Sequence, residues 1–273
     1  MQVVLLIIIV LMIILIVVVS RGTPPLSVEP FEKKTTLVVM ACHASTELKI
    51  KLILNNLAYF TEIGDEFVLV DSQECEWNDL ESRIPVMYPQ IKLTMFRVHN
   101  DPIFICHAKY LFYLQNHASH YSAFERVILT NDSFLVCQSL ERFGKLKDSD
   151  DYDMTSLVAS NELRFHFTDF LRSYRTTVLP FLINYFLLHR DKVHCIFSLI
   201  RQYEINSTFA FSRKKALYEA ESGYEGNIHF DDAKIYIYLM HKEYPVIKLK
   251  KLVEMDAREW KDRVPVKVIP FLY

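Results

Sequence analysis

The sequence predicts an α/β fold with a mostly parallel sheet flanked by helices, preceded by one N-terminal transmembrane helix. Two observations carry this prediction. Short apolar runs rich in Val, Ile and Leu alternate with longer segments of helical period, and this alternation is typical of a parallel sheet covered by helices on both faces. The chain also begins with an unbroken apolar run, Val3–Val19, which as a helix would span about 26 Å, close to the thickness of a bilayer core.

Composition limits the classes of protein to consider. A chain of 273 residues with 51% apolar and 23% charged residues is too apolar to be mainly disordered and long enough for one large domain or two small ones. The net charge of -2 and the lack of a long Lys/Arg run argue against nucleic acid as a partner. The five cysteines are scattered without a CxxC pair, so neither a zinc knuckle nor a dense disulfide framework is predicted.

Three regions follow from these patterns. We predict a transmembrane anchor over residues 1–20, a stem over 21–34 that contains three prolines, and a folded domain over 35–273. A cleaved signal peptide is the alternative for the first region, but no small-residue cleavage site follows the apolar run. We therefore predict an uncleaved anchor.

Strands and helices alternate through the first half of the folded domain. A helix is expected from Ser45 or Thr46, either of which can cap it, to Phe60. A second helix is expected from Ile103 to Tyr121. The expected strands around them are Thr35–Cys42, Phe67–Val70, Ile91–Val98 and Val127–Leu129. The second half is less regular, and its expected elements are strands at Met154–Ala159 and Val246–Val253 and helices at Pro180–His189, Val193–Tyr203 and Ala233–His241.

Each of the first four strands ends in polar residues. These are His43, Asp71, Asn100 with Asp101, and Asn131 with Asp132. In open α/β sheets, ligands bind outside the carboxyl ends of the strands. We therefore expect these side chains to converge on a polar ligand at one edge of the sheet.

Asp132 is the strongest candidate because a buried apolar strand delivers it directly to that edge. Two other interpretations of Asn131-Asp132-Ser133 stay open: a simple turn, and a glycosylation sequon. A single strand-end carboxylate suits a divalent cation bound to a diphosphate, because Mg²⁺ and Mn²⁺ take most of their ligands from phosphate and water. The chain has no Gly-rich phosphate-binding loop.

Several landmarks resemble those of one known family. They are the run VILTNDSF, the strand candidate from Asp153 to Ala159, His166–Leu171 with the pattern HFxxFL, the aromatic segment Phe181–Phe186, and the pair Tyr203-Glu204. In this order they resemble the rhamnan synthesis F family, glycosyltransferases of polysaccharide assembly related to nucleotide-sugar enzymes of the GT-A fold. The resemblance covers about residues 36–220.

The resemblance implies a GT-A-like, Rossmann-like domain that transfers a sugar from a nucleotide-sugar donor to a glycan or lipid-linked acceptor. It places Asp132 as the ligand of Mn²⁺ or Mg²⁺, or of the donor diphosphate, with Asn131 and Ser133 in support. The other polar strand ends, His43, Asp71 and Asp101, are expected to line the donor site.

Two further candidates come from the second half of the chain. Glu204 is a candidate general base, since inverting transfer needs a carboxylate to accept the acceptor's proton; the alternative is a surface residue at a helix end. His229, together with Asp231, is a candidate to complete a metal or diphosphate shell; the alternative is that Asp231 or Asp232 caps a helix. Arg164 and Arg172 either clamp phosphate or lie on the solvated face of a strand.

Two more questions stay open at this point. A non-catalytic, membrane-tethered protein that binds glycans or nucleotide sugars on the same fold is the alternative function. A hydrolase is disfavoured because neither GxSxG nor HExxH occurs. We expect a lumenal body, as in single-anchor enzymes of this kind, although the basic residues after the anchor favour a cytoplasmic one.

Overall fold

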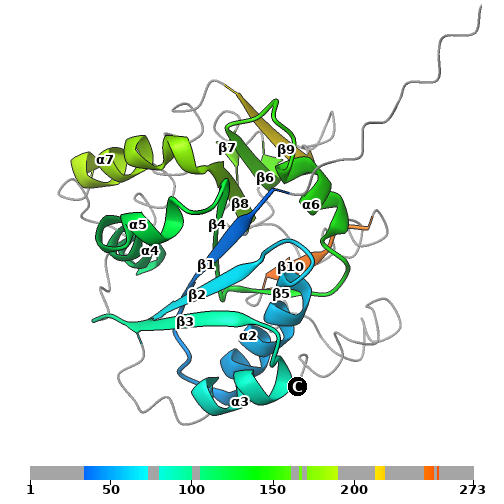
Figure 1. Cartoon of the computed structure of the whole chain (residues 1–273). Helices are drawn as coiled ribbons and strands as arrows, with labels where there is room; N and C mark the ends of the chain where they lie inside the picture. The colour runs from blue at the N-terminus through cyan, green and yellow to red at the C-terminus, as the bar shows by residue number, and fades with distance from the viewer. Residues whose placement is uncertain are drawn as a thin grey trace, which may run out of the picture. The chain divides into compact units, whose positions relative to one another are not determined.

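The computed structural model (Figure 1) describes eight parts of the chain. They are residues 34–72, 80–99, 105–160, 166–167, 171–189, 213–218, 243–248 and 251. The predicted anchor and nearly all of the predicted stem lie outside them. Among the described residues no helix is long and apolar enough to cross a membrane, so the anchor stays a prediction.

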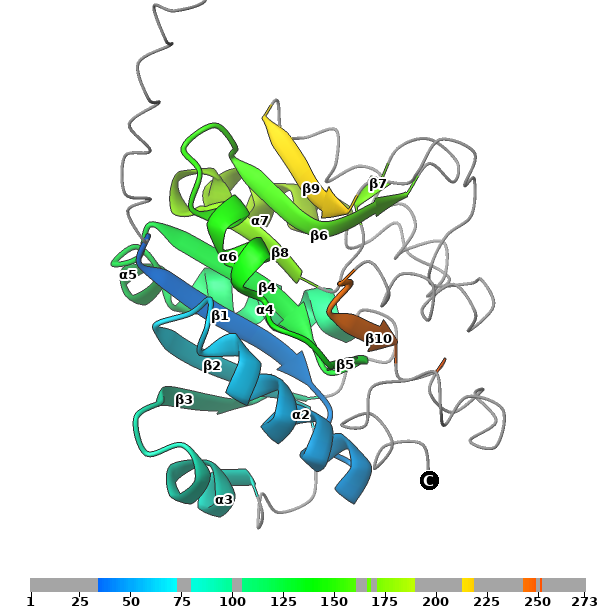
Figure 2. The same ribbon diagram turned by 90° about the vertical axis from the view of Figure 1, so that its right-hand side faces the viewer.

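Four parallel strands form one half of the main sheet, in the order β3-β2-β1-β4 (Figure 2). They are β1 (Thr36–Cys42), β2 (Glu66–Asp71), β3 (Lys92–Arg97) and β4 (Arg126–Asn131). Every residue of β1, β2 and β4 is buried, whereas β3 at the sheet edge is partly exposed. The apolar runs in the sequence therefore predicted these strands to within two residues at every end.

The other half of the sheet departs from parallel order. Strand β8 (Leu171–Arg175) lies between β4 and β6 (Met154–Ser160) and runs antiparallel to both. Strand β6 also pairs with β7 (His166–Phe167) and, in parallel, with β9 (Lys214–Tyr218). Strands β5 (Phe134–Val136), β7, β8 and β9 were not predicted with these bounds; β8, for example, is short and carries two arginines.

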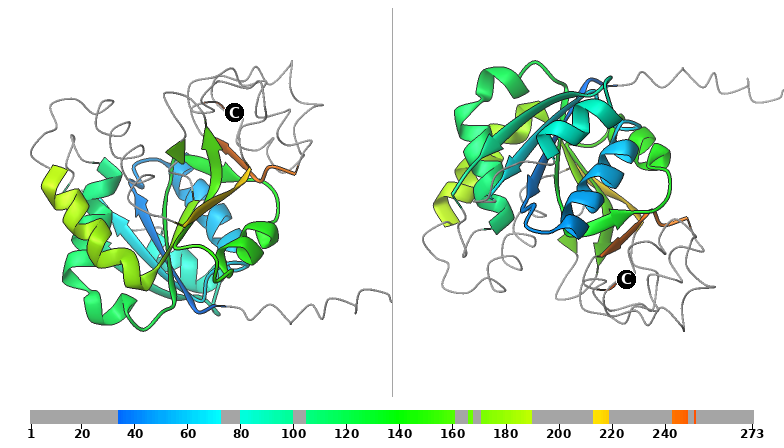
Figure 3. Two further views of the ribbon diagram at one scale, coloured as in Figure 1. Left: turned by 90° about the horizontal axis from the view of Figure 1, so that it is seen from above. Right: turned by 90° about the horizontal axis from the view of Figure 1, so that it is seen from below.

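Helices cover both faces of the sheet, as predicted (Figure 3). One face packs against α2 (Glu47–Phe60), α3 (Leu80–Met87) and α6 (Glu141–Lys147). The opposite face packs against α4 (Ile105–Asn116), α5 (Ala118–Tyr121) and α7 (Leu179–His189), which follows the short 3-10 helix Thr176–Val178. The single helix predicted from Ile103 to Tyr121 is thus two helices, with His117 between them.

Helix α2 begins and ends for identifiable reasons. The Thr46 side chain accepts a hydrogen bond from the Lys49 backbone N–H at 3.3 Å, which caps the first turn as predicted. After the helix, the chain turns back into the sheet at Gly64. A Cβ at that position would lie 2.4 Å from the Val38 Cγ2 atom, so only glycine allows this close approach.

A small second sheet joins β5 (Phe134–Val136) to β10 (Val246–Lys248). Two asparagines of α2 bind the other side of β5. The buried Asn56 amide donates to the Phe134 carbonyl and accepts from the Val136 N–H, both at 2.8 Å. The Asn55 amide donates to the Val136 carbonyl at 2.8 Å. These side chains take the place of a neighbouring strand for β5.

Two sequence predictions need correction. The last predicted strand, Val246–Val253, ends at Lys248, and Lys251 is helical. Arg172 is only 1% exposed and lies opposite Leu129 within the sheet, so its side chain does not belong to a solvated strand face. Arg164 lies outside the described residues.

Candidate functional site

Asp132 lies directly after β4, at the carboxyl ends of the parallel strands, and is only 7% exposed. Its Oδ2 atom accepts the His43 backbone N–H at 2.9 Å, and its Oδ1 atom lies 3.2 Å from the Lys49 ammonium. The Asp132 backbone N–H donates to the Ala41 carbonyl at 3.3 Å. Main chain and side chain together therefore fix this carboxylate against the end of β1.

The neighbours of Asp132 form a hydrogen-bonded turn. The Asn131 Oδ1 atom accepts from both the backbone N–H of Ser133, at 2.9 Å, and the Ser133 hydroxyl. This is the pattern of an Asx turn, so Asp132 lies within a turn at the end of β4, and its role in binding stays a prediction. Asn131 is 4% exposed, and such burial leaves little access for glycosylation of the folded chain.

The structure brings the ends of β1 and β2 to the same place. The Asp71 Oδ1 atom accepts the Ala44 backbone N–H at 3.1 Å, and the His43 Nδ1 atom lies 3.2 Å from the Ser72 hydroxyl. His43, Asp71 and Asp132 thus lie around one edge of the sheet, as the parallel order requires. Their roles in binding stay a prediction.

Three predicted site residues cannot be placed beside them. Asp101, Glu204 and His229 lie outside the described residues, as do Asn100, Asp231 and Asp232. Their proposed roles therefore rest on the sequence alone.

Two lysines at this edge, Lys49 and Lys109, were not predicted from the sequence. Lys49 approaches from α2 on one face of the sheet. Lys109 approaches from α4 on the opposite face, is 3% exposed, and donates to the Cys42 carbonyl at 2.7 Å. The sequence does show that both lysines lie on predicted helices next to the strand ends. The helical pattern does not show which turn of each helix lies at the edge of the sheet, so their contacts could not be predicted.

The charges at the edge are balanced. Burial raises the pKa of the Cys42 thiol well above its usual range, Asp71 and Asp132 raise it further, and Lys109 and Lys49 oppose the shift. Two carboxylates and two ammonium groups therefore act on one atom at the end of β1. The thiol stays protonated at neutral pH, which makes Cys42 a packed residue rather than a nucleophile.

The described residues contain no group of three or more His, Cys, Asp or Glu side chains that could hold a metal ion, so a divalent cation at this edge would depend on Asp132 and on the donor's own phosphates. Both carboxylate oxygens of Asp132 have protein partners, and one partner is a cation. The groups that this edge presents to a ligand are the Lys49 ammonium, on a side chain that is 22% exposed, and the partly buried His43 imidazole. An ammonium group suits an anionic oxygen.

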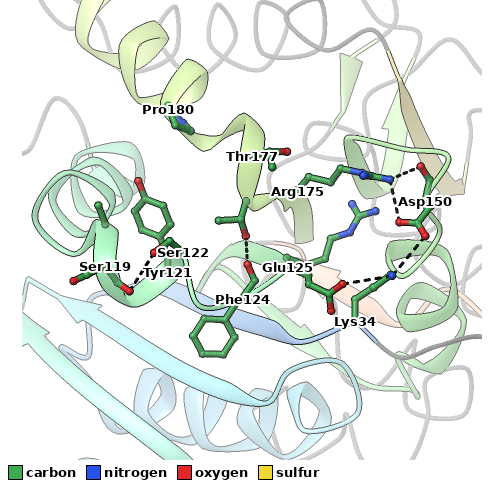
Figure 4. Close-up of a pocket in the computed structure, with 13 residues that line it drawn as sticks. Lys34, Ser119, Tyr121, Ser122, Phe124, Glu125, Asp150, Arg175, Thr177 and Pro180 are labelled. Carbon is green, nitrogen blue, oxygen red and sulfur yellow. Dashed lines mark hydrogen bonds and ion pairs between the residues drawn. The ribbon is translucent and has the colours of Figure 1, made fainter.

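A pocket formed by described residues lies elsewhere (Figure 4). It has a volume of about 670 Å³ and is lined by residues that flank the amino ends of β1 and β4, about 20 Å along β4 from Asp132. Its charged groups pair with one another: Lys34 lies 3.4 Å from Glu125 and 3.5 Å from Asp150, and Arg175 lies 3.1 Å from Asp150. We assign no ligand to this pocket, because it lies at the amino ends of the strands, away from the edge where open α/β sheets bind ligands.

Comparison with known proteins supports the fold. No family model and no curated protein matches the sequence, so membership of the rhamnan synthesis F family is not confirmed. Among solved structures, the chain is similar to the WbbM bifunctional glycosyltransferase, with 13% identity, a TM-score of 0.50, and 87% of this chain and 50% of that chain covered.

Two further structures are less similar. One is the mannosyltransferase PcManGT from Pyrobaculum calidifontis in complex with GDP-Man and Mn²⁺, with 15% identity, a TM-score of 0.40, and 59% of this chain and 50% of that chain covered. The other is the galactosyltransferase LgtC in complex with donor and acceptor sugar analogues, with 14% identity, a TM-score of 0.41, and 67% and 73% covered. The matches span about half the length of WbbM and PcManGT. The likeness to WbbM shows that the described domain has a GT-A-like α/β fold.

Proposed function

We propose that this chain is a glycosyltransferase that takes a sugar from a nucleotide-sugar donor, bound at the carboxyl ends of β1, β2 and β4. The observation that carries the proposal is Asp132: a buried carboxylate at the end of β4, joined to β1 through the His43 N–H at 2.9 Å, in a sheet of GT-A-like fold. Ligands of open α/β sheets bind at this edge.

The remaining parts of the proposal come from the sequence. The acceptor is a glycan or a lipid-linked acceptor, the body of the protein is lumenal, and the N-terminal segment anchors it in the membrane. Glu204 is the proposed base for the acceptor hydroxyl. A Mn²⁺ or Mg²⁺ ion held by Asp132 and His229 belongs to this sequence-based proposal, but we assign it no step because both carboxylate oxygens of Asp132 already have protein partners.

The role of Asp132 is tested by replacing it with asparagine in the full chain in detergent. Asp132→Asn keeps the size of the side chain and removes its charge, so we expect donor hydrolysis and transfer to fall at least tenfold across a panel of nucleotide sugars. The matched control is Asp65→Asn. Asp65 also accepts a backbone N–H of β1, that of Thr36 at 2.8 Å, but it does so at the opposite edge of the sheet.

The outcomes separate the candidates. Loss of activity in both variants would indicate damage to β1 and not to a site. Unchanged turnover in Asp132→Asn would refute the proposed role of Asp132. Donor binding by the unmodified chain, without hydrolysis or transfer to any acceptor, would support the alternative of a non-catalytic binding protein.

A further inference from the structure

We propose that Lys49 supplies the positive charge that neutralises the donor's diphosphate, so that this chain binds its donor without a divalent cation. The inference rests on the proposed function and concerns the same edge of the sheet. It starts from the observation that the carboxylate expected to hold a metal ion already faces a cation of the protein itself, 3.2 Å away.

The position of Lys49 is fixed by two contacts with one residue. Its ammonium lies 3.2 Å from Asp132 Oδ1 and donates to the Asp132 backbone carbonyl at 3.0 Å. An ammonium group has three N–H donors, and these contacts use two of them. The Lys49 side chain is 22% exposed, so its third donor can meet a ligand oxygen without rearrangement of the pair.

The same contacts oppose a metal ion. A Mg²⁺ ion binds carboxylate oxygen at about 2.1 Å, so an ion on Asp132 Oδ1 would lie no more than about 5 Å from the Lys49 nitrogen if the pair stayed in place. Two such charges repel, and the ammonium would have to leave both the carboxylate and the carbonyl. Lys49 is thus an internal competitor for the site that a metal would occupy.

Lys49 rather than Lys109 is the group for a ligand. Lys109 is 3% exposed and bound to the Cys42 carbonyl, where it offsets the buried carboxylates. Lys49 also lies in the first turn of α2, a helix of 14 residues capped by Thr46. The positive end of that helix faces the same edge and favours an anion beside the ammonium.

The test is isothermal calorimetry on the full chain in detergent, with UDP, GDP and inorganic pyrophosphate as probes in the presence of EDTA. We expect at least one nucleotide to bind, and excess Mn²⁺ or Mg²⁺ to tighten binding by no more than about threefold. Lys49→Met should weaken binding in EDTA by about tenfold to a hundredfold, the range for a hydrogen bond to a charged group.

Two variants control for folding and charge. Lys49→Arg keeps the charge and should retain binding within about threefold. Lys51→Met removes an exposed lysine two residues along the same helix and should change nothing. Circular dichroism on all three variants checks that α2 is intact.

Each result has one meaning. Binding that appears only with Mn²⁺ or Mg²⁺, or binding in EDTA that Lys49→Met leaves unchanged, would overturn this inference and leave the proposed function standing. Failure of every nucleotide to bind, with and without metal, would count against the proposed function itself.

Discussion

Replacing Asn56 with leucine should destabilise the domain by about 3 kcal/mol. Asn56 is fully buried and makes two hydrogen bonds of 2.8 Å to the backbone of β5, one as donor and one as acceptor. Leucine has nearly the same size, so the main effect is two buried backbone groups without partners, each costing about 1–3 kcal/mol. Some of this loss is offset because the added apolar side chain is buried.

The assay is pulse proteolysis in urea, which reports the free energy of unfolding, combined with amide hydrogen exchange of the peptide that covers β5. The Val136 N–H loses its acceptor in Asn56→Leu, so its exchange should accelerate. Asn55→Ala is the matched control, because it removes one hydrogen bond of 2.8 Å to the same strand from a half-buried side chain and should cost about 1 kcal/mol. A smaller loss in Asn56→Leu than in Asn55→Ala would refute the reasoning.

Two further predictions concern the sheet and the acid side of the stability curve. Gly64→Ala should lower the free energy of unfolding by about 1–3 kcal/mol in the same urea assay, because the new Cβ would lie 2.4 Å from Val38 Cγ2. The control is Gly144→Ala, where the nearest contact of the new Cβ is 3.3 Å and the loss should be smaller. An equal or larger loss in Gly144→Ala would contradict the prediction. The hydrogen bond from Arg213, 2.6 Å long, lowers the pKa of Asp153. The stability this adds is present above the unfolded pKa, near 3.9, and is lost as pH falls through the lower folded value. Arg213→Gln should therefore flatten the fall in urea midpoint below about pH 4, and an unchanged acid slope would exclude this pair as a contributor.

The parallel half of the sheet was predictable because burial on both faces demands an unmistakable composition. Runs such as Leu37–Cys42 and Val127–Leu129 have no polar position, and Thr46 marks the start of the helix between the first two strands. The antiparallel strand β8 gave no such signal. Its Arg172 is buried by its neighbours in the sheet, and that environment is created by contacts distant in sequence.

The candidate site was predictable to the same extent. Parallel strands put their carboxyl ends at one edge, so His43, Asp71 and Asp132 could be brought together from chain order alone. The lysines could not, because they reach that edge from helices whose rotation and depth are set by packing. Knowing that Asp132 faces Lys49 changes the chemistry expected of the carboxylate, and only three-dimensional contacts reveal it.

The place of β1 in the sheet has a consequence for synthesis of the protein. One side of β1 pairs with β2, which follows closely in the chain, whereas the other side pairs with β4. Thr35 precedes β1 and Glu125 precedes β4; these two residues hydrogen-bond to each other and are 90 positions apart in the chain. At about 5–20 residues per second, a ribosome needs roughly 5–20 s to cover that interval. During that time a strand whose residues are all apolar except Thr36 has an open edge, which is the kind of surface that pairs with other chains. A chaperone that shields extended apolar segments would act on this nascent chain before β4 emerges.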